Sequence, residues 1–436
     1  MDLALGHKGY QRQIVICFWL YLFFLIFEGA FRKWIFPSFS NVFLIIRDPI
    51  ALYVLWLGLK HNLVKSGYAR FFIIISIVCF FTTLIFGHQN LWAALYGFRI
   101  TGINLPAAFV FGEVLKKNDL IRIGKFVLFV SIIMTGIIFT QYFSPQSSWI
   151  NRGVGGNLEG SGFQTLEDYF RPSGTFSFVS GMIGFEFMVI TFFVCFIFDH
   201  IYTSKLYIWV LALLYLLANF VCLSRTVITQ SCIVMLFFLV LPFLRHKEGG
   251  KVFLFLILMI VLFVILYHWG PFQIAFDNMT TRFSNASDAE GNFVSGSIGN
   301  RYGGSFYRAF FDTQNFSGKS IPFWGFGLGA GTHVGATILG LHEVSSFSFA
   351  EEPWSLIICE SGYFLGGLIL IVGRLFFPLS YSIKAIKSLK KENNIWAYFS
   401  IPFFFVSMIT YQWSVPTYLG FTVIACSLMC ATLKNH

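Results

Sequence analysis

The sequence predicts an all-α polytopic membrane protein with about 12 transmembrane helices. The first observation behind this prediction is the composition: 56% of the 436 residues are hydrophobic, 20% are aromatic and only 11% are charged. The second is that apolar runs of about 17 to 25 residues, long enough to cross a ~30 Å hydrocarbon core, recur along the chain. The third is that these runs are continuous, whereas strands of an outer-membrane barrel are ~10-residue segments of alternating polarity. Helices are therefore expected rather than a barrel.

The expected spans divide one integral membrane domain into three parts. Residues 1–268 form a nine-helix region, residues 269–353 a large loop with short interfacial helices, and residues 354–436 three C-terminal transmembrane helices. In chain order the twelve expected spans cover residues 14–31, 41–59, 71–87, 91–112, 126–142, 176–198, 206–223, 227–244, 252–268, 354–380, 395–413 and 416–433.

All eight cysteines fall inside these expected spans. Neither the connecting loops nor the 269–353 interval can therefore build a disulfide framework or a thiolate zinc site. We expect small buried residues at these positions, and no metal site.

The distribution of Lys and Arg predicts which side each part faces. With twelve spans both termini lie on one side, and the loops of that side carry twice as many Lys and Arg residues as the opposite loops. By the positive-inside rule both termini are cytoplasmic and the 269–353 loop is extracytoplasmic. The net charge of +10 then follows in part from topology, with no nucleic acid as partner. ATP-driven chemistry in the loop is not expected, because nucleotides are cytoplasmic.

Arginines near the outer side are the candidates for an anion site. The positive-inside rule disfavours them there, and the planar guanidinium suits phosphate better than a lysine point charge does. Arg47 opens the second expected span beside Asp48, and Arg99 lies about two turns into the fourth. Charges at such depth are functional candidates. The alternative is an ion pair that fixes the helices, for instance between Asp48 and Arg47 or Arg99.

The turn Ser224-Arg225-Thr226 lies at the outer junction of the seventh and eighth expected spans. A short turn needs only polar residues, so an arginine between two hydroxyls is more than the turn requires. A guanidinium, two hydroxyls and the free amides of a helix N-terminus together make an anion site.

The 269–353 interval carries cations, glycines and aromatic residues. Glycines at 325, 327, 329 and 331 do not predict a nucleotide site, because no strand precedes them. We expect them to let the loop approach a bulky lipid-linked substrate. Residues 305–316, with aromatic residues around Arg308, suit a helix at the membrane interface, where a polyprenyl chain would enter from the bilayer.

In its C-terminal half the chain resembles the O-antigen polymerase and O-antigen ligase family of bacterial envelope glycosyltransferases. The resemblance is carried by the large loop before the tenth span, the Ser224-Arg225-Thr226 turn, the glycine run at 325–331 and the segment 351–366, which reads EEPWSLIICESGYFLG. It implies a GT-C-like architecture and a metal-independent enzyme without cofactor. The donor would be a polyprenyl-diphosphate-linked sugar whose diphosphate is held by arginines. Ligases of the family resemble this segment with a His-Asn pair where Glu351 and Glu352 stand here, which favours a polymerase.

The acceptor hydroxyl needs a base, and a carboxylate near the membrane surface can serve. Glu351 and Glu352 are the candidates, although an acidic pair in a first helical turn is also favoured by the helix dipole. Glu360 lies about two turns deeper, roughly 12 Å along the helix, and is expected to be structural. His333 and His342 are the other possible bases.

The sequence therefore predicts a multi-pass protein of the bacterial inner membrane that polymerises undecaprenyl-diphosphate-linked oligosaccharide repeat units on the periplasmic face. Its partners would be this substrate, membrane lipid, a chain-length regulator and a flippase. The alternatives are an O-antigen ligase and a polysaccharide transporter or lipid flippase. The residues expected to bind the diphosphate are Arg225 and Arg301, then Arg282, Arg99 and Ser224, with Arg47 and Arg308 as further possibilities.

Overall fold

The computed structural model describes residues 9–158, 164–166, 169–202, 204–244, 249–290, 304–312, 321–340 and 352–434. Nearly all of these residues are helical. One short antiparallel hairpin, in which the three residues of β1 pair with the two of β2, interrupts the helices.

The N-terminal half consists of long apolar helices whose ends carry local capping residues. The Asn90 side chain accepts hydrogen bonds from the Trp92 and Ala93 amides at the start of one helix, and the Asp119 carboxylate accepts from the Lys116 amide at the start of another, which satisfies amides that a helix start leaves open. The elements are α1 (Tyr10–Ala30), η1 (Phe31–Ile35), η2 (Pro37–Phe39), α2 (Ser40–Leu44), α3 (Arg47–Lys60), α4 (Gly67–Phe86), α5 (Leu91–Phe98), η3 (Arg99–Asn104), α6 (Leu105–Val114), α7 (Lys117–Phe143), η4 (Trp149–Asn151), η5 (Val154–Gly156), β1 (Gln164–Leu166), β2 (Tyr169–Phe170) and α8 (Val179–Phe198).

The C-terminal half repeats this pattern, with shorter helices around residues 304–340. Ser204 and Asn394 cap the starts of two of its helices through their side chains. The elements are α9 (Lys205–Val221), α10 (Arg225–Leu244), α11 (Gly249–Tyr267), α12 (Gly270–Glu290), α13 (Gly304–Tyr307), η7 (Arg308–Asp312), α15 (His333–Ile338), α16 (Pro353–Leu368), η9 (Ile369–Phe376), α17 (Phe377–Glu392), α18 (Ile395–Thr410) and α19 (Pro416–Lys434).

The protein is a multi-pass helical membrane protein. Within the described residues, nine helices are long and apolar enough to cross a membrane, or ten if the bent pair Met259–Tyr267 and Gly270–Asn285 is one span. Leu206–Val221 and Ile395–Thr410 are apolar but shorter. The predicted class is thus confirmed, whereas the number of twelve spans stays a prediction.

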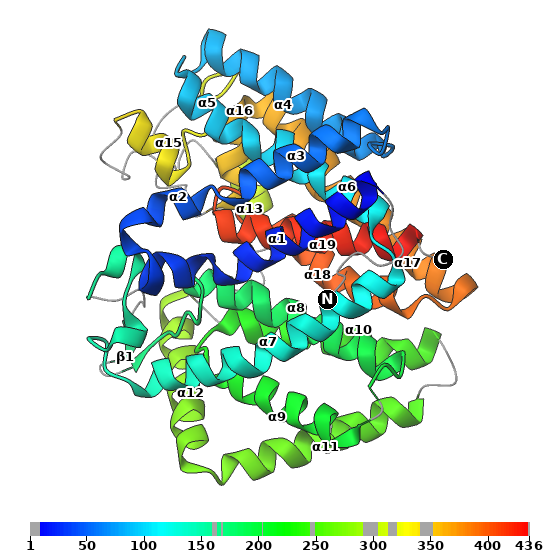
Figure 1. Ribbon diagram of the computed structural model, residues 1–436. Coiled ribbons are helices and arrows are strands. Elements are labelled where there is room, and N and C mark those ends of the chain that lie inside the picture. Colours follow the sequence, from blue (N-terminus) through cyan, green and yellow to red (C-terminus); the bar gives the residue numbers. More distant parts are fainter. Residues whose placement is uncertain are drawn as a thin grey trace.

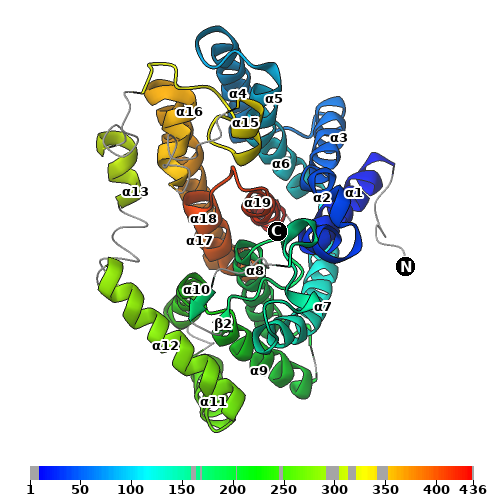
Figure 2. The same cartoon turned by 90° about the vertical axis from the view of Figure 1, so that its left-hand side faces the viewer.

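The helices run side by side between two faces of the bundle. On one face α1 begins and α19 ends, at the right of Figure 1, and we call it the terminal face. The opposite face, at the left, presents α2, the β1–β2 hairpin and α15, and Figure 2 looks directly onto it. We call it the loop face. Helix α8 lies in the middle of the bundle. Since 94% of its apolar stretch is buried, it packs against protein on all sides.

The interval after residue 268 begins with regular structure rather than with a loop. Helix α12 bends away from the preceding helix by 102° and continues to Glu290. It packs against α9, where Phe220 contacts Phe272 and Phe276. The short helical segment expected over 305–316 is present from Gly304 to Asp312 as α13 and η7. These helices bring the charges of the interval to defined positions on the loop face.

Candidate functional site

The turn between α9 and α10 is the first part of the candidate site. Helix α9 ends at Val221, and Leu223 adopts a left-handed conformation with φ of 47°, which is costly for a residue with a side chain. The Cys222 and Leu223 amides bond back to the Ala218 and Phe220 carbonyl groups. The reversal lets α10 start directly at Arg225, so its free amides point toward the loop face.

Arg282 of α12 joins this turn, although it lies far away in the sequence. Its Nη1 donates a hydrogen bond to the Leu223 carbonyl oxygen. Helix α12 is also tied to α7, because the Asn278 side chain donates to the Tyr142 hydroxyl at 2.7 Å. Asn278 and Arg282 are one turn apart on the same face of α12, so the tie to α7 also positions Arg282.

Ser224 completes the cluster, which we call the arginine turn and define as Leu223, Ser224, Arg225 and Arg282. Ser224 is 1% exposed, and its hydroxyl makes no hydrogen bond to any part of the chain that the structure describes. A buried hydroxyl without a partner is costly, and Ser224 shares this feature with Ser355, Ser382 and Ser407. Its place directly before α10 sets it apart, because the amides of a helix start lie beside it. Arg171, which follows β2, lies close enough to Cys222 to interact with it electrostatically. The structure thus brings together three of the residues predicted to bind diphosphate, namely Ser224, Arg225 and Arg282.

The other predicted residues of the 269–353 interval lie in two groups. Arg301, His342 and Glu351 lie outside the described residues. Glu352 precedes α16 and forms an ion pair with Arg308 of η7, whose Nη2 contacts its Oε1. The second oxygen of Glu352 is buried and makes no hydrogen bond to the described residues. His333 starts α15 and is exposed.

The intramembrane arginines Arg47 and Arg99 belong to a separate cluster. Nη1 of Arg99 lies 3.0 Å from each oxygen of Asp48, and Nη2 of Arg47 lies 3.2 Å from Glu28. Glu28 also pairs with Arg32 at 3.2 Å. These five residues form the buried charge network, which joins α1, η1, α3 and η3. Its geometry is that of the helix-fixing alternative, with Asp48 bound to Arg99 and not to Arg47.

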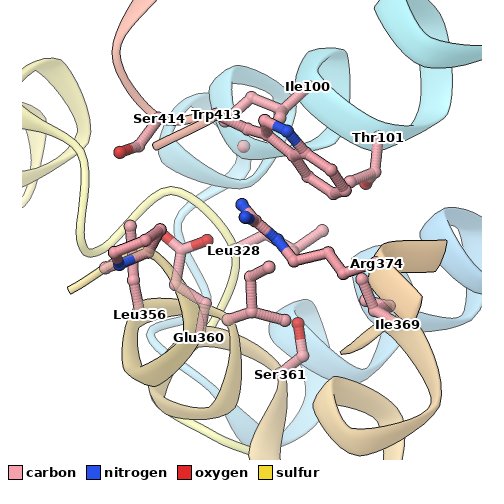
Figure 3. Close-up of a pocket in the computed structure, with 13 residues that line it drawn as sticks. Ile100, Thr101, Leu328, Leu356, Glu360, Ser361, Ile369, Arg374, Trp413 and Ser414 are labelled. Carbon is pink, nitrogen blue, oxygen red and sulfur yellow. The ribbon is translucent and has the colours of Figure 1, made fainter. Parts of the chain in front are cut away.

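A small pocket lies between α5, α16 and the turn from α18 to α19. Figure 3 shows two charged side chains, Glu360 and Arg374, pointing into it. Arg374 is fully buried, and its guanidinium donates to the carbonyl oxygens of Ile409 at 2.8 Å and Tyr411 at 3.0 Å. It also stacks on the Trp413 ring, 3.9 Å from the centroid. The cavity is about 30 Å³, enough for a water molecule and too small for a sugar.

The helix that carries Glu360 is interrupted two residues later, which sequence reasoning did not anticipate. Gly362 has φ 75° and ψ 171° inside α16, a conformation that only glycine adopts readily. One oxygen of Glu360 accepts a hydrogen bond from the Gly331 amide at 2.9 Å. Arg374 lies inside the expected span 354–380, and the sequence predicts no role for it. The available signal was an arginine deep in an apolar run.

The glycine run at 325–331 packs against protein backbone. Gly325, Gly327 and Gly329 all have positive φ. A Cβ on Gly329 would lie 2.3 Å from the Ala93 carbonyl oxygen, and one on Gly325 would lie 2.5 Å from that of Glu360. Side chains there would separate the loop from α5 and α16. The described contacts of these glycines fit a structural role, and the expected approach to a substrate stays a prediction.

Comparison with protein-family models, with curated proteins and with solved structures finds no match. The class that fold and composition define is a multi-pass helical membrane protein. The resemblance to O-antigen polymerases and ligases stays a prediction from the motifs.

Proposed function

We propose that the protein is a membrane glycosyltransferase that joins polyprenyl-diphosphate-linked oligosaccharide repeat units into a polysaccharide. The observation that carries the proposal is the arginine turn, where Arg282 bonds the Leu223 carbonyl oxygen directly before Ser224 and Arg225, the latter starting α10. The buried Ser224 hydroxyl makes no hydrogen bond to the described residues. Guanidinium groups, a hydroxyl and helix amides are the donors that a diphosphate needs.

The chemistry of sugar transfer gives these donors a task. The acceptor hydroxyl attacks the anomeric carbon of the donor sugar, and the bond from that carbon to the diphosphate oxygen breaks. Negative charge develops on the leaving diphosphate as the bond breaks. Donors already aimed at that position stabilise the transition state more than the ground state. We assign this role to Arg225 and Arg282, with Arg301 as a further member.

The proton of the acceptor hydroxyl needs an acceptor on the same face. Glu352 has one oxygen held by Arg308 and a second, buried oxygen without a hydrogen bond. Arg308 orients the carboxylate, and the second oxygen remains to accept a proton. We assign Glu352, with its neighbour Glu351, to the acceptor side of the reaction.

The side of the membrane follows from the charges. The loop face holds the arginine turn and Glu352, and the positive-inside rule puts this face outside the cytoplasm. A lipid-linked repeat unit that a flippase has delivered to the periplasmic leaflet would meet the site there. A chain-length regulator is the natural further partner.

Deletion of the gene tests the proposal through the surface polysaccharide. Loss of a polymerase leaves single repeat units on their acceptor. Loss of a ligase leaves long chains on the polyprenyl carrier, and loss of a flippase leaves lipid-linked units inside the cell. Purified protein in vesicles should build a ladder of polymer from lipid-linked repeat units without nucleotide. An unchanged polysaccharide in the deletion strain would contradict the proposal.

A further inference from the structure

An apolar cavity of about 400 Å³ lies between α10, α17 and α18. Its wall includes Ile233 and Phe237 of α10, Ile386 of α17, and Val406 and Ile409 of α18. The volume falls in the range of roughly 300 to 1,000 Å³ that small-molecule pockets have. It is more than ten times larger than the pocket between Glu360 and Arg374, so it can hold a chain of several carbon units.

The cavity lies below the arginine turn along the same helix. Gln230, Ile233 and Phe237 are spaced i, i+3 and i+7, so they share one face of α10. Arg225 starts this helix, and Phe237 lies twelve residues further on, about 18 Å by the helical rise. The Gln230 amide donates to the Tyr411 hydroxyl at 3.1 Å. The face therefore changes from polar near the arginine turn to apolar at the depth of the cavity.

We propose that this cavity binds the first isoprene units of a polyprenyl diphosphate whose diphosphate lies at the arginine turn. The identity of this lipid rests on the proposed function. One feature favours it over an ordinary membrane lipid. The cations of the arginine turn, at the start of α10 above the cavity, complement a diphosphate attached directly to a single chain.

The cavity orients the substrate more than it adds affinity. Lipid tails are as apolar as the cavity wall, so moving a chain from bilayer to cavity gains little hydrophobic free energy. A chain fixed below the arginine turn, however, fixes the direction in which the diphosphate leaves, and such positioning contributes to rate. Pro402 also lines the cavity, within α18. Proline has no backbone N–H, so α18 lacks one helical hydrogen bond beside the cavity.

The aromatic surface of α13 and η7 is the rival location for the lipid chain. Phe306, Tyr307 and Phe311 are 42%, 59% and 71% exposed. Their rings lie on a surface, whereas the cavity is lined by residues of three helices. The two locations lie on different segments and give different labelled peptides.

Photo-cross-linking of the unmodified protein tests the proposal. A polyprenyl diphosphate with a diazirine on its second or third isoprene unit is added to the protein in nanodiscs, and labelled residues are mapped by mass spectrometry. Labels on Ile233, Phe237 and Val406, displaced by undecaprenyl diphosphate but not by phosphatidylglycerol, are expected. Labels on Phe306 and Phe311, or equal displacement by phosphatidylglycerol, would overturn the proposal.

A filled cavity provides the matched comparison. Ile233→Trp should lower labelling at Val406 about tenfold, because added volume in a packed site excludes the chain. Leu236→Trp on the same helix is the control, since Leu236 is 57% exposed and does not line the cavity. Its labelling should equal that of the unmodified protein. Equal labelling in both tryptophan variants would contradict the assignment, and circular dichroism checks that both fold.

The labelling experiment does not depend on polymer formation. Labels in the cavity together with an unchanged polysaccharide in the deletion strain would reject the polymerase and keep the lipid site. Labels elsewhere together with a polymer defect would reject the cavity and keep the polymerase.

Discussion

The buried charge network and the arginine turn use the same residue type for different purposes. In the network Arg99 faces both oxygens of Asp48, and Glu28 lies within 3.2 Å of both Arg32 and Arg47. In the arginine turn Arg282 donates to a backbone carbonyl oxygen, and the Ser224 hydroxyl has no acceptor. In the network each guanidinium faces a carboxylate from the bundle's own helices, although the Nε atoms of Arg32, Arg47 and Arg99 make no hydrogen bond to the described residues. The turn presents donors that suit an anion from outside.

This difference indicates how a membrane protein can keep arginines for structure and for binding. A buried ion pair is weak evidence for net stability, but removing one partner leaves a charge without compensation. Loss of a network carboxylate should therefore unfold the protein, while loss of a turn arginine should leave the fold and remove function. The following variants test this contrast.

The largest effect is expected for Asp48→Ala. It leaves the Arg99 guanidinium, which is 8% exposed, without its carboxylate, at a cost of about 3 to 5 kcal/mol. Thermal unfolding in detergent should occur at a clearly lower temperature. The double variant Asp48→Ala with Arg99→Ala should recover part of the loss. A single variant that unfolds like the unmodified protein would remove the structural role of the network.

Arg225→Ala and Arg282→Ala should both lower the polymerisation rate. Arg225→Ala should leave the unfolding temperature nearly unchanged, whereas Arg282→Ala should lower it slightly because the hydrogen bond to the Leu223 carbonyl oxygen is lost. Loss of one donor aimed at transition-state charge costs roughly 10² to 10³ in rate. Arg70→Ala is the control, since Arg70 is an exposed arginine at the terminal face that bonds the Lys65 carbonyl group. The rate is measured from polymer length on a gel, with purified protein and lipid-linked repeat units. Equal rates for all three variants would put the diphosphate elsewhere.

Ser224→Ala should have the smallest effect. The variant removes one hydroxyl donor, which is worth about 0.5 to 1.5 kcal/mol, or roughly two- to tenfold in rate. Its stability should be unchanged or slightly higher, because the hydroxyl is buried without a partner. Ser380→Ala, whose hydroxyl bonds the Phe377 carbonyl group at the start of α17, is the control. A Ser224→Ala protein with full activity and lower stability would reverse the assignment.

The sequence predicted local features of the site better than distant ones. Ser224 and Arg225 are adjacent in the chain, so their turn follows from the end of one apolar run and the start of the next. Arg282 ranks after Arg225 and Arg301 among the residues predicted to bind the diphosphate. It reaches the turn because α12 bends back by 102° onto α9. The bend itself falls at Gly270 and Pro271, a pair that interrupts helices. The packing of α12 onto α9 through Phe220, Phe272 and Phe276 joins residues far apart in the chain, and that pairing has no local signature.

Pairings inside the bundle were predicted only in part. Asp48 was the expected partner of Arg47 or Arg99, and the structure pairs it with Arg99. Arg47 instead contacts Glu28, which lies one helix away. The pocket of Glu360 and Arg374 was not predicted, because it needs the break at Gly362 and the carbonyl groups of Ile409 and Tyr411. Apolar length predicts helices, but not which polar residues meet between them.

Direct binding of a polyprenyl diphosphate tests the central claim that the arginine turn holds the diphosphate. The dissociation constant of a fluorescent polyprenyl diphosphate is measured for the protein in nanodiscs, with Arg225→Ala and Arg282→Ala combined. The combined variant should bind at least about tenfold more weakly than the unmodified protein, since each charge-assisted contact contributes to affinity. Affinity equal to that of Arg70→Ala would contradict the account.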